Sequence, residues 1–253
     1  TTEIYTLSLH DALPIYRFKR FLPEGMALAT SVGGEATASG KIGGALQGRL
    51  ALNIAPGSLQ MEANGQPVRF TLNGGSLRLD TDGRTASGQA RLDLAQTGQL
   101  QATAQVQDPF GAARITGKLN ANVTDLKVAS AFVPQLQNVV GQLRADVNVT
   151  GPVSKPAVGG EIRLENAGMA IPEAGIKLQD LRFAAVSTGQ GPLRLTGSVR
   201  SDPGQLQLTG EADLLKPQLN LAVSGEKFQA LNTTDLQIQL SPDLKLELTR
   251  QQA

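Results

Sequence analysis

The chain has 253 residues, with 23 Lys and Arg against 22 Asp and Glu, one His, and no Cys or Trp. Without Cys it has no thiol nucleophile, disulfide, Cys-based zinc site or iron–sulfur cluster, and one His, at position 10, excludes multi-histidine metal sites. A formal net charge of +1 argues against nucleic acid as the main partner.

The remaining composition favours a sheet with frequent turns. Apolar residues make up 40% of the chain but aromatics only 4%, so the buried surface has to come from Leu, Val, Ile and Ala. The 28 Gly and 13 Pro predict many turns. No apolar run reaches the length of a membrane-spanning helix. We therefore expect an all-β chain with an extended sheet.

Residues 1–15, TTEIYTLSLHDALPI, differ in texture from the rest of the chain. Their periodicity is poor, and they resemble translated adapter DNA from shotgun sequencing. We expect them to be non-native, so that His10 carries no chemistry. The alternatives are an ordinary N-terminal strand or a damaged signal sequence, but a signal peptide needs a basic start and a continuous apolar core. Residues 16–253 are then expected to be a fragment of a longer protein.

From Ser31 onward a Gly opens each segment and apolar residues occupy every second position after it. Gly48–Ile54, Gly88–Leu94 and Gly141–Val149 show the pattern. Period two is typical of a strand with one dry and one wet face. The opening glycines are irregularly spaced, which argues against a solenoid of fixed period.

The breaks between these segments carry turn residues. Examples are Asn73-Gly74-Gly75, Asp82-Gly83, Asp202-Pro203-Gly204 and Ser241-Pro242-Asp243. Pro presets the first turn angle and Gly permits positive φ, so these short sequences favour tight connections. Closely spaced strands joined in this way predict a meander of neighbouring antiparallel strands.

Two stretches interrupt the alternation. Thr124 or Asp125 is a suitable N-cap, and Pro134 a stop, for a short helix over 125–133, which we expect to plug or cap the sheet. The two prolines of the segment 151–156 predict a bend.

From Leu193 to the end the alternation is almost uninterrupted. An amphipathic sheet has to cover its apolar face with a second sheet, with helices, or by curling on itself. Because little of the chain is helical, we predict an elongated, curled antiparallel sheet, a β-taco with an open groove that could hold acyl chains. An ordinary β-sandwich or closed solenoid would show the same pattern. The candidate groove-lining residues are Leu193, Leu195, Leu206, Leu208, Leu219, Leu221, Val223, Leu236, Ile238, Leu240, Leu244, Leu246 and Leu248.

No enzyme signature is present. The chain lacks a G-x-S-x-G elbow, a phosphate-binding G-x-x-x-x-G-K-[ST] loop and a G-x-G-x-x-G fingerprint. The paired carboxylates Asp80/Asp82 and Glu161/Glu165 fall in predicted turns or on wet strand faces, where such pairs are solvated. We therefore expect no enzyme, no catalytic residue, no metal site and no cofactor.

The passage Gly151–Leu181, GPVSKPAVGGEIRLENAGMAIPEAGIKLQDL, resembles a stretch of the TamB family of AsmA-like proteins. The predicted helix from Asp125 to Pro134 and the segment that begins at Gly141 also fit. Ser241–Leu246 resembles the lead into the family's C-terminal conserved region. In texture the resemblance extends from Ser31 to Arg250.

This resemblance implies a long β-taco protein of the Gram-negative envelope, anchored in the inner membrane and reaching across the periplasm. Its implied partners are phospholipid acyl chains, an outer-membrane barrel with POTRA domains similar to TamA, and unfolded outer-membrane proteins. The implied function is a conduit for outer-membrane biogenesis that carries phospholipid or assists the assembly and secretion of autotransporter-type proteins. The alternatives from the residues are a structural or adhesive β-solenoid with a closed core, and a carbohydrate-active β-helix enzyme.

Overall fold

A computed structural model of the protein describes residues 3–14, 26–40, 46–63, 66–127, 129, 133, 135–189, 191–213 and 218–249. Within them the chain forms nineteen β-strands and one three-residue 3-10 turn, η2 (Pro172–Ala174). The predicted all-β fold class is therefore confirmed. The chain divides into two compact units: unit 1 is Thr1–Asn122 with Asn148–Ala157, and unit 2 is Val123–Val147 with Val158–Ala253.

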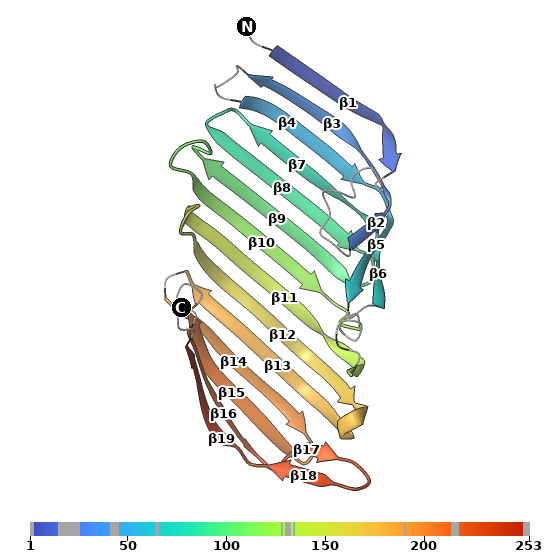
Figure 1. Ribbon diagram of the computed structural model, residues 1–253, viewed down its shortest axis with the longest axis vertical. Helices are drawn as coiled ribbons and strands as arrows, with labels where there is room; N and C mark the ends of the chain where they lie inside the picture. The colour runs from blue at the N-terminus through green and yellow to red at the C-terminus, as the bar shows by residue number, and fades with distance from the viewer. Residues whose placement is uncertain are drawn as a thin grey trace. The chain divides into compact units, whose positions relative to one another are not determined.

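Unit 1 contains an antiparallel sheet with the strand order β1-β3-β4-β7-β8-β9-β10 (Figure 1). The order is linear, and β1 and β10 do not pair in the described part of unit 1, so this sheet is open as predicted. The strands are β1 (Glu3–Pro14), β3 (Ser31–Gly40), β4 (Leu46–Ile54), β7 (Gly74–Thr81), β8 (Thr85–Leu94), β9 (Gly98–Gln107) and β10 (Arg114–Val123).

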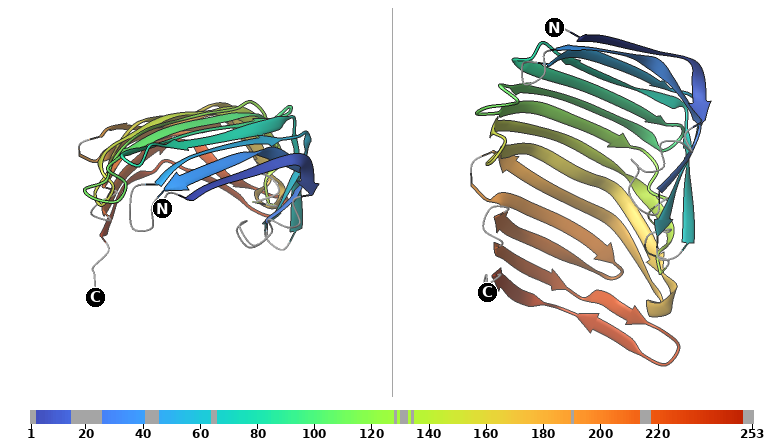
Figure 2. Two further views of the ribbon diagram at one scale, coloured as in Figure 1. Left: turned by 90° about the horizontal axis from the view of Figure 1, so that it is seen from above. Right: turned by 45° about the horizontal axis from the view of Figure 1, so that its top comes forward.

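A second, three-stranded sheet lies at one end of these strands in unit 1. It consists of β2 (Met26–Ala29), β5 (Gly57–Ala63) and β6 (Gln66–Leu72), in the order β2-β5-β6, and β6 packs against β8. Figure 2 shows the strands of unit 1 curving toward this small sheet. At the corner the Thr30 hydroxyl donates a hydrogen bond to the Ala55 carbonyl at 2.5 Å, and Leu72 is fully buried.

Unit 2 contains most of a long strand, β11 (Gln137–Pro152), and an antiparallel sheet with the order β12-β13-β14-β15-β16-β19. Its strands are β12 (Ala157–Ile171), β13 (Ile176–Thr188), β14 (Leu193–Ser201), β15 (Gly204–Asp213), β16 (Gln218–Glu226) and β19 (Asp243–Thr249). The order is again linear. A separate two-stranded sheet, β17 (Phe228–Asn232) and β18 (Gln237–Leu240), contacts β13, β14, β15 and η2.

The predicted meander is correct for most neighbours and wrong at three places, the first being β1, which pairs with β3 while β2 joins the three-stranded sheet. β4 pairs with β7, so that β5 and β6 leave the main sheet, and β16 pairs with β19, so that β17 and β18 leave it. The alternating Leu236, Ile238 and Leu240 therefore do not continue the main sheet of unit 2. Tertiary pairing, which period two does not specify, decides which strands are neighbours.

Three other predictions concern the helix over 125–133, the bend at 151–156 and the N-terminal residues 1–15. The Val133 amide donates to the Ala129 carbonyl at 3.0 Å, the spacing of an α-helical turn, but residues 128 and 130–132 of the predicted helix 125–133 lie outside the described residues. The segment 151–156 contains the turn between β11 and β12, where the backbone amide of Lys155 donates to the Pro152 carbonyl at 3.0 Å. Residues 3–14 form β1, and the expected origin of residues 1–15 stays a prediction.

The turn between β7 and β8 is held by a carboxylate. Asp82 accepts hydrogen bonds from the backbone amides of Arg84 at 2.8 Å and Thr85 at 2.7 Å. These bonds stabilise the charged form, so the pKa of Asp82 lies below its ordinary value, with the Thr85 amide as the largest cause. Asp82-Gly83 was predicted as a turn, and the Asp side chain is what fixes it.

We expect Asp82→Ala to lower the melting temperature at neutral pH, because the two amides lose their acceptor. A lowered folded-state pKa means that this stabilisation is complete above the ordinary pKa of Asp, about 3.9, and is lost as the pH falls through the folded-state value. Thermal unfolding from neutral to acidic pH measures the difference from wild type, which should shrink in acid. Asp82→Asn keeps a neutral acceptor, so a matching loss in that variant would contradict the assignment.

Candidate functional site

The register of unit 1 places its alternating apolar residues on one face of the sheet. Ala36, Leu50, Leu79, Gly88 and Ala104 lie opposite one another on five successive strands. Three further rows lie on the same face and contain Val32, Ile54, Gly75, Leu92 and Leu100; Gly34, Leu52, Leu77, Ala90 and Ala102; and Ala38, Gly48, Thr81, Ala86 and Val106. Thr81 is the only polar side chain among them. We call these four rows the apolar face of unit 1.

The opposite face of the same strands is polar. Its row Thr37, Arg49, Asp80, Ser87 and Gln105 lies between two apolar rows in register. Arg49 Nε donates to Asp80 Oδ1 at 2.7 Å, and this hydrogen bond is the largest cause of the raised pKa of Arg49. Both side chains are exposed, so the pair contributes little to stability. One polar and one apolar face were predicted, and the register confirms this alternation.

Each face of unit 1 bears a hollow of similar size. The hollow on the polar face has about 630 Å³ and is lined by hydroxyl, amide and charged groups such as Glu35, Gln47 and Asp80. The hollow on the apolar face has about 610 Å³ and is lined mainly by Ala36, Ala38, Leu50, Leu79 and Val106. Water can hydrogen-bond to the groups that line the polar hollow. Covering the apolar hollow with an apolar ligand is favourable, because it removes apolar surface from water. We take the latter, the unit 1 hollow, as the candidate site.

Glycines shape the apolar face. A Cβ atom at Gly88 would lie 3.0 Å from Leu79 Cδ2, and one at Gly75 would lie 3.2 Å from Leu92 Cδ1. The leucine side chains therefore lie over their glycine neighbours instead of standing away from the sheet. Leu79 nevertheless keeps 42% of its surface exposed, so the described residues leave this part of the face uncovered.

Unit 2 has an apolar face of the same kind, and ten of the thirteen predicted groove-lining residues lie on it. One row contains Leu195, Gly210, Leu221 and Leu246, and the next contains Gly197, Leu208, Val223 and Leu244. The remaining predicted residues of this face are Leu193, Leu206, Leu219 and Leu248. The residues between them face the other way: Gln207 aligns with Ser198, Ser224 and, through Ser224, Asp243.

The other three predicted groove-lining residues lie elsewhere. Ile238 and Leu240 are on β18. Leu236 lies in the turn before β18, where its amide donates a hydrogen bond to the Thr233 hydroxyl at 3.2 Å. All three side chains are exposed. The apolar face of unit 1 was missing from the predicted site, although the same alternation at Leu50, Leu52 and Ile54 marks it in the sequence.

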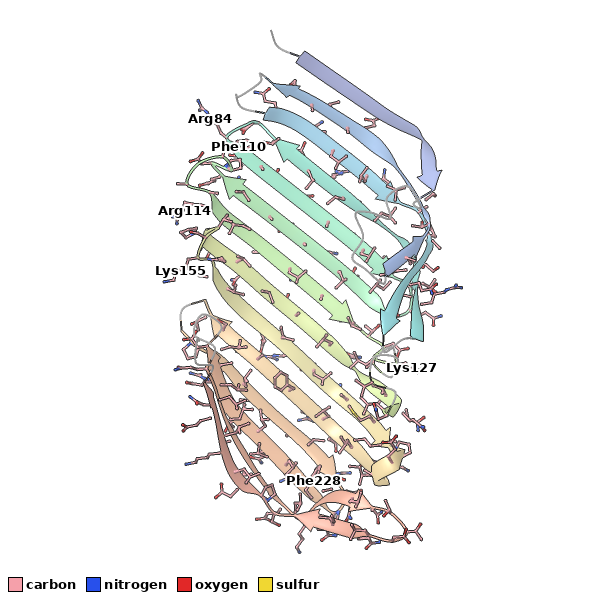
Figure 3. The ribbon with its side chains drawn as sticks, viewed as in Figure 1. Arg84, Phe110, Arg114, Lys127, Lys155 and Phe228 are labelled. Carbon is pink, nitrogen blue, oxygen red and sulfur yellow. The ribbon has the colours of Figure 1, made fainter. Side chains whose placement is uncertain are left out.

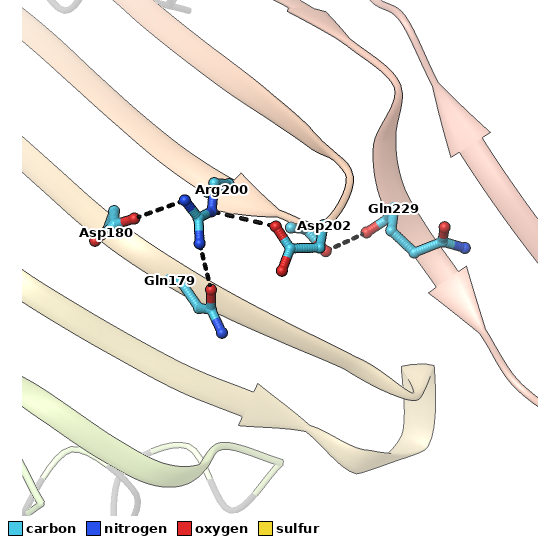
Figure 4. A network of polar contacts seen from close by, with 6 residues as sticks. Gln179, Asp180, Arg200, Asp202 and Gln229 are labelled. Carbon is cyan, nitrogen blue, oxygen red and sulfur yellow. Dashed lines mark hydrogen bonds and ion pairs between the residues drawn. The ribbon is translucent and has the colours of Figure 1, made fainter.

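A polar network joins β17 to the end of β14 in unit 2 (Figure 4). Arg200 contacts Asp180 at 3.5 Å, Asp202 at 3.2 Å and the Gln179 side chain at 2.9 Å. The Ser201 hydroxyl, which is 2% exposed, donates to the Gln229 carbonyl at 2.7 Å. This buried bond fixes β17 against the main sheet of unit 2.

The predicted solvated carboxylates line two open hollows: Asp80 and Asp82 lie in the hollow on the polar face of unit 1, and Glu161 and Glu165 line one of about 460 Å³ in unit 2. Glu161 pairs with Arg163 at 2.5 Å on an exposed strand face, and the bond raises the pKa of Arg163. Among the described residues no group of three or more His, Cys, Asp or Glu side chains is arranged to hold a metal ion. In the same part of the chain, no helix is both apolar and long enough to span a bilayer.

Comparison with known families agrees with this arrangement. Residues 9–164 match the N-terminal domain of TamB, and residues 182–253 match the TamB C-terminal domain. The C-terminal match begins well before Ser241, where the resemblance in the sequence had placed the approach to that region. No solved structure matches the chain. Because the first match alone covers more than half of the 253 residues, the chain belongs to the TamB family.

Proposed function

We propose that this chain is part of a periplasmic hydrophobic conduit that carries phospholipid acyl chains toward the outer membrane. The TamB family is linked to outer-membrane biogenesis, and its members are envelope proteins that span the periplasm and act in transport and assembly, not as enzymes. The observation that supports lipid as the cargo is the apolar face, which runs in register across five strands of unit 1 and recurs in unit 2.

Acyl chains suit such a face for a physical reason. Each methylene that leaves water gains about 0.8 kcal/mol, and an open face captures part of that gain for every methylene in contact. The gain is non-directional, so a chain can slide between equivalent rows without breaking specific bonds. A cargo of this kind needs no individual catalytic or coordinating residue, which agrees with the mixture of Leu, Val, Ala and Gly at these positions.

A second cargo, an unfolded outer-membrane polypeptide, is favoured by one feature of unit 2. β19 pairs with β16 along one edge, and its other edge has no strand partner among the described residues. Leu244, Leu246 and Leu248 on this strand are each about half exposed. A client strand could add to such an edge through main-chain hydrogen bonds. In the same proposal the conduit is anchored in the inner membrane and delivers to an outer-membrane barrel with POTRA domains similar to TamA.

The proposal is tested by photo-crosslinking in cells. We expect crosslinkers at Leu208 and Leu221 to capture phospholipid, because both positions lie on the apolar face of unit 2. Matched crosslinkers at Gln207 and Asn220, one residue away on the polar face, should capture several-fold less. The measurement is the lipid content of each crosslinked product by mass spectrometry. Lipid at the two polar positions and none at the two leucines would overturn the proposal, as would protein as the sole adduct.

A further inference from the structure

One edge of unit 1 carries a row of exposed cations. Arg84 lies in the β7–β8 turn, Arg114 begins β10, and Lys155 lies in the β11–β12 turn, and Figure 3 shows all three along the same edge. Phe110 lies in the β9–β10 turn and is 73% exposed, and Val153 lies in the β11–β12 turn and is 49% exposed. We call these five residues the cationic rim.

Backbone hydrogen bonds join the turns of the rim into one structure. The Asp108 amide donates to the Arg84 carbonyl at 2.7 Å, and the Val153 amide donates to the Ala113 carbonyl at 2.9 Å. These bonds connect the β7–β8 turn to the β9–β10 turn, and the latter to the β11–β12 turn. The cations therefore stand on a connected edge and not on independent loops.

The acidic side chains of this edge accept hydrogen bonds from backbone amides of their own turns. Asp82 accepts the amides of Arg84 and Thr85, and Asp108 accepts the Ala112 amide at 2.9 Å. Arg84 lies near enough to Asp82 to contribute to its lowered pKa, yet Arg84, Arg114 and Lys155 form no salt bridge with any described residue. Three exposed cations therefore face solvent without a paired carboxylate.

The rim is asymmetric and adjoins the unit 1 hollow. At the other end of β7, β8 and β9, the turns at Asn73 and Ala95–Thr97 contain no cation, and the connection that follows β10 contains Lys127, which is paired with Asp125 at 3.7 Å. The row of the apolar face nearest the rim includes Ala86 and Val106, which line the hollow. Ala86 is two residues from Arg84, a distance of about 7 Å along an extended strand.

We propose that the cationic rim holds the phosphate of an anionic phospholipid whose acyl chain lies in the unit 1 hollow. This inference rests on the proposed function, because it assumes an acyl chain on the apolar face. The charge of the rim complements a lipid phosphate, and exposed Phe110 and Val153 suit the apolar region directly below the headgroup. The cationic rim adjoins the apolar hollow, as the charged headgroup of a lipid adjoins its acyl chains. An acidic protein surface would contact the rim but would not need the hollow.

The test compares two photoreactive lipids with the same acyl chains, phosphatidylglycerol and diacylglycerol, on the full chain. The rim variant combines Arg84→Gln, Arg114→Gln and Lys155→Gln. The control variant removes the same charge from elsewhere in unit 1, with Arg78→Gln, Arg91→Gln and Lys118→Gln. All six side chains are exposed, so both variants should keep the wild-type circular dichroism spectrum.

We expect the rim variant to bind phosphatidylglycerol about 25-fold more weakly than wild type, since Arg84 and Arg114, the two cations nearest the unit 1 hollow, each contribute about fivefold. Its diacylglycerol labelling should be unchanged, and the control variant should bind both lipids nearly as wild type does. A lysine version of the rim, with Arg84→Lys and Arg114→Lys, should retain most of the binding because it keeps the charge.

Other results would overturn the inference. Equal weakening by the rim and control variants would mean that only overall charge matters. Displacement of the lipid by inorganic phosphate at equal charge would mean that the rim binds a free anion. Displacement by polyglutamate at equal charge would mean that it binds an acidic protein. Wild-type binding of both lipids by the rim variant would reject the rim and leave the conduit intact, whereas failure of the wild-type protein to label with either lipid would reject the conduit itself.

Discussion

Replacing Leu79 by Asp is expected to lower acyl-chain capture in the unit 1 hollow by about 100-fold while the sheet remains folded. Leu79 lines that hollow on the apolar face of unit 1. A carboxylate in contact with hydrocarbon costs about 3 kcal/mol, which corresponds to about two decades in affinity. The fold should survive because Leu79 is already partly exposed, so that a carboxylate there still reaches water in the absence of lipid.

The matched control for Leu79→Asp is Gln89→Asp. Gln89 lies on the polar face of the neighbouring strand β8 and is exposed, so it adds the same charge to the same part of the sheet. Labelling by a photoreactive diacylglycerol, titrated against each variant, measures the capture. Leu221→Asp and Asn220→Asp form the equivalent pair in unit 2. Equal labelling of the Leu79 and Gln89 variants would show that the apolar face does not hold the chain.

The two faces could be predicted from sequence because strand geometry leaves little freedom. Side chains alternate at every residue, so Leu50, Leu52 and Ile54 have to share a face once β4 is a strand. Tight turns then fix the register of each new strand against the preceding one, as at Asp82-Gly83 between β7 and β8. The outcome is a continuous apolar face even though no single residue on it is distinctive.

The departures from the main sheet could not be predicted in the same way. Leu236, Ile238 and Leu240 show the same alternation as Leu244, Leu246 and Leu248, yet only the latter three pair with β16. The difference comes from contacts distant in sequence. Lys227 has a positive φ of 48°, and its amide donates to the Ser241 hydroxyl at 3.0 Å. These contacts redirect the chain between β16 and β17, and alternation does not encode them.

The candidate site was predicted only in part for a related reason. The prediction concentrated on the final strands, where alternation is densest, and omitted the hollow over β3, β4, β7, β8 and β9. That hollow exists because Gly48, Gly88 and several alanines meet across strands. Which small residues become neighbours depends on register across four strand pairs, and a single strand read alone does not reveal it.

A large loss of stability is expected for Gly204→Ala in unit 2. Gly204 begins β15 and is buried, and a Cβ atom there would collide with the backbone of Glu226 and Lys227, where the chain passes from β16 to β17. Because backbone atoms cannot rotate away as a side chain can, the crossover has to move. We expect the free energy of unfolding to fall by about 2 kcal/mol, measured by urea denaturation.

Gly197→Ala is the control that adds the same methyl group to the adjoining strand β14. Its Cβ would lie 3.3 Å from the Arg182 carbonyl oxygen and 3.7 Å from Leu208 Cβ, so small adjustments accommodate it and the expected loss is below about 1 kcal/mol. Displacement of the crossover should also break the Ser201–Gln229 bond. Hydrogen exchange in β17 should therefore accelerate in Gly204→Ala and not in Gly197→Ala. Equal stability of the two variants, with unchanged exchange in β17, would mean that the crossover does not depend on close approach at Gly204.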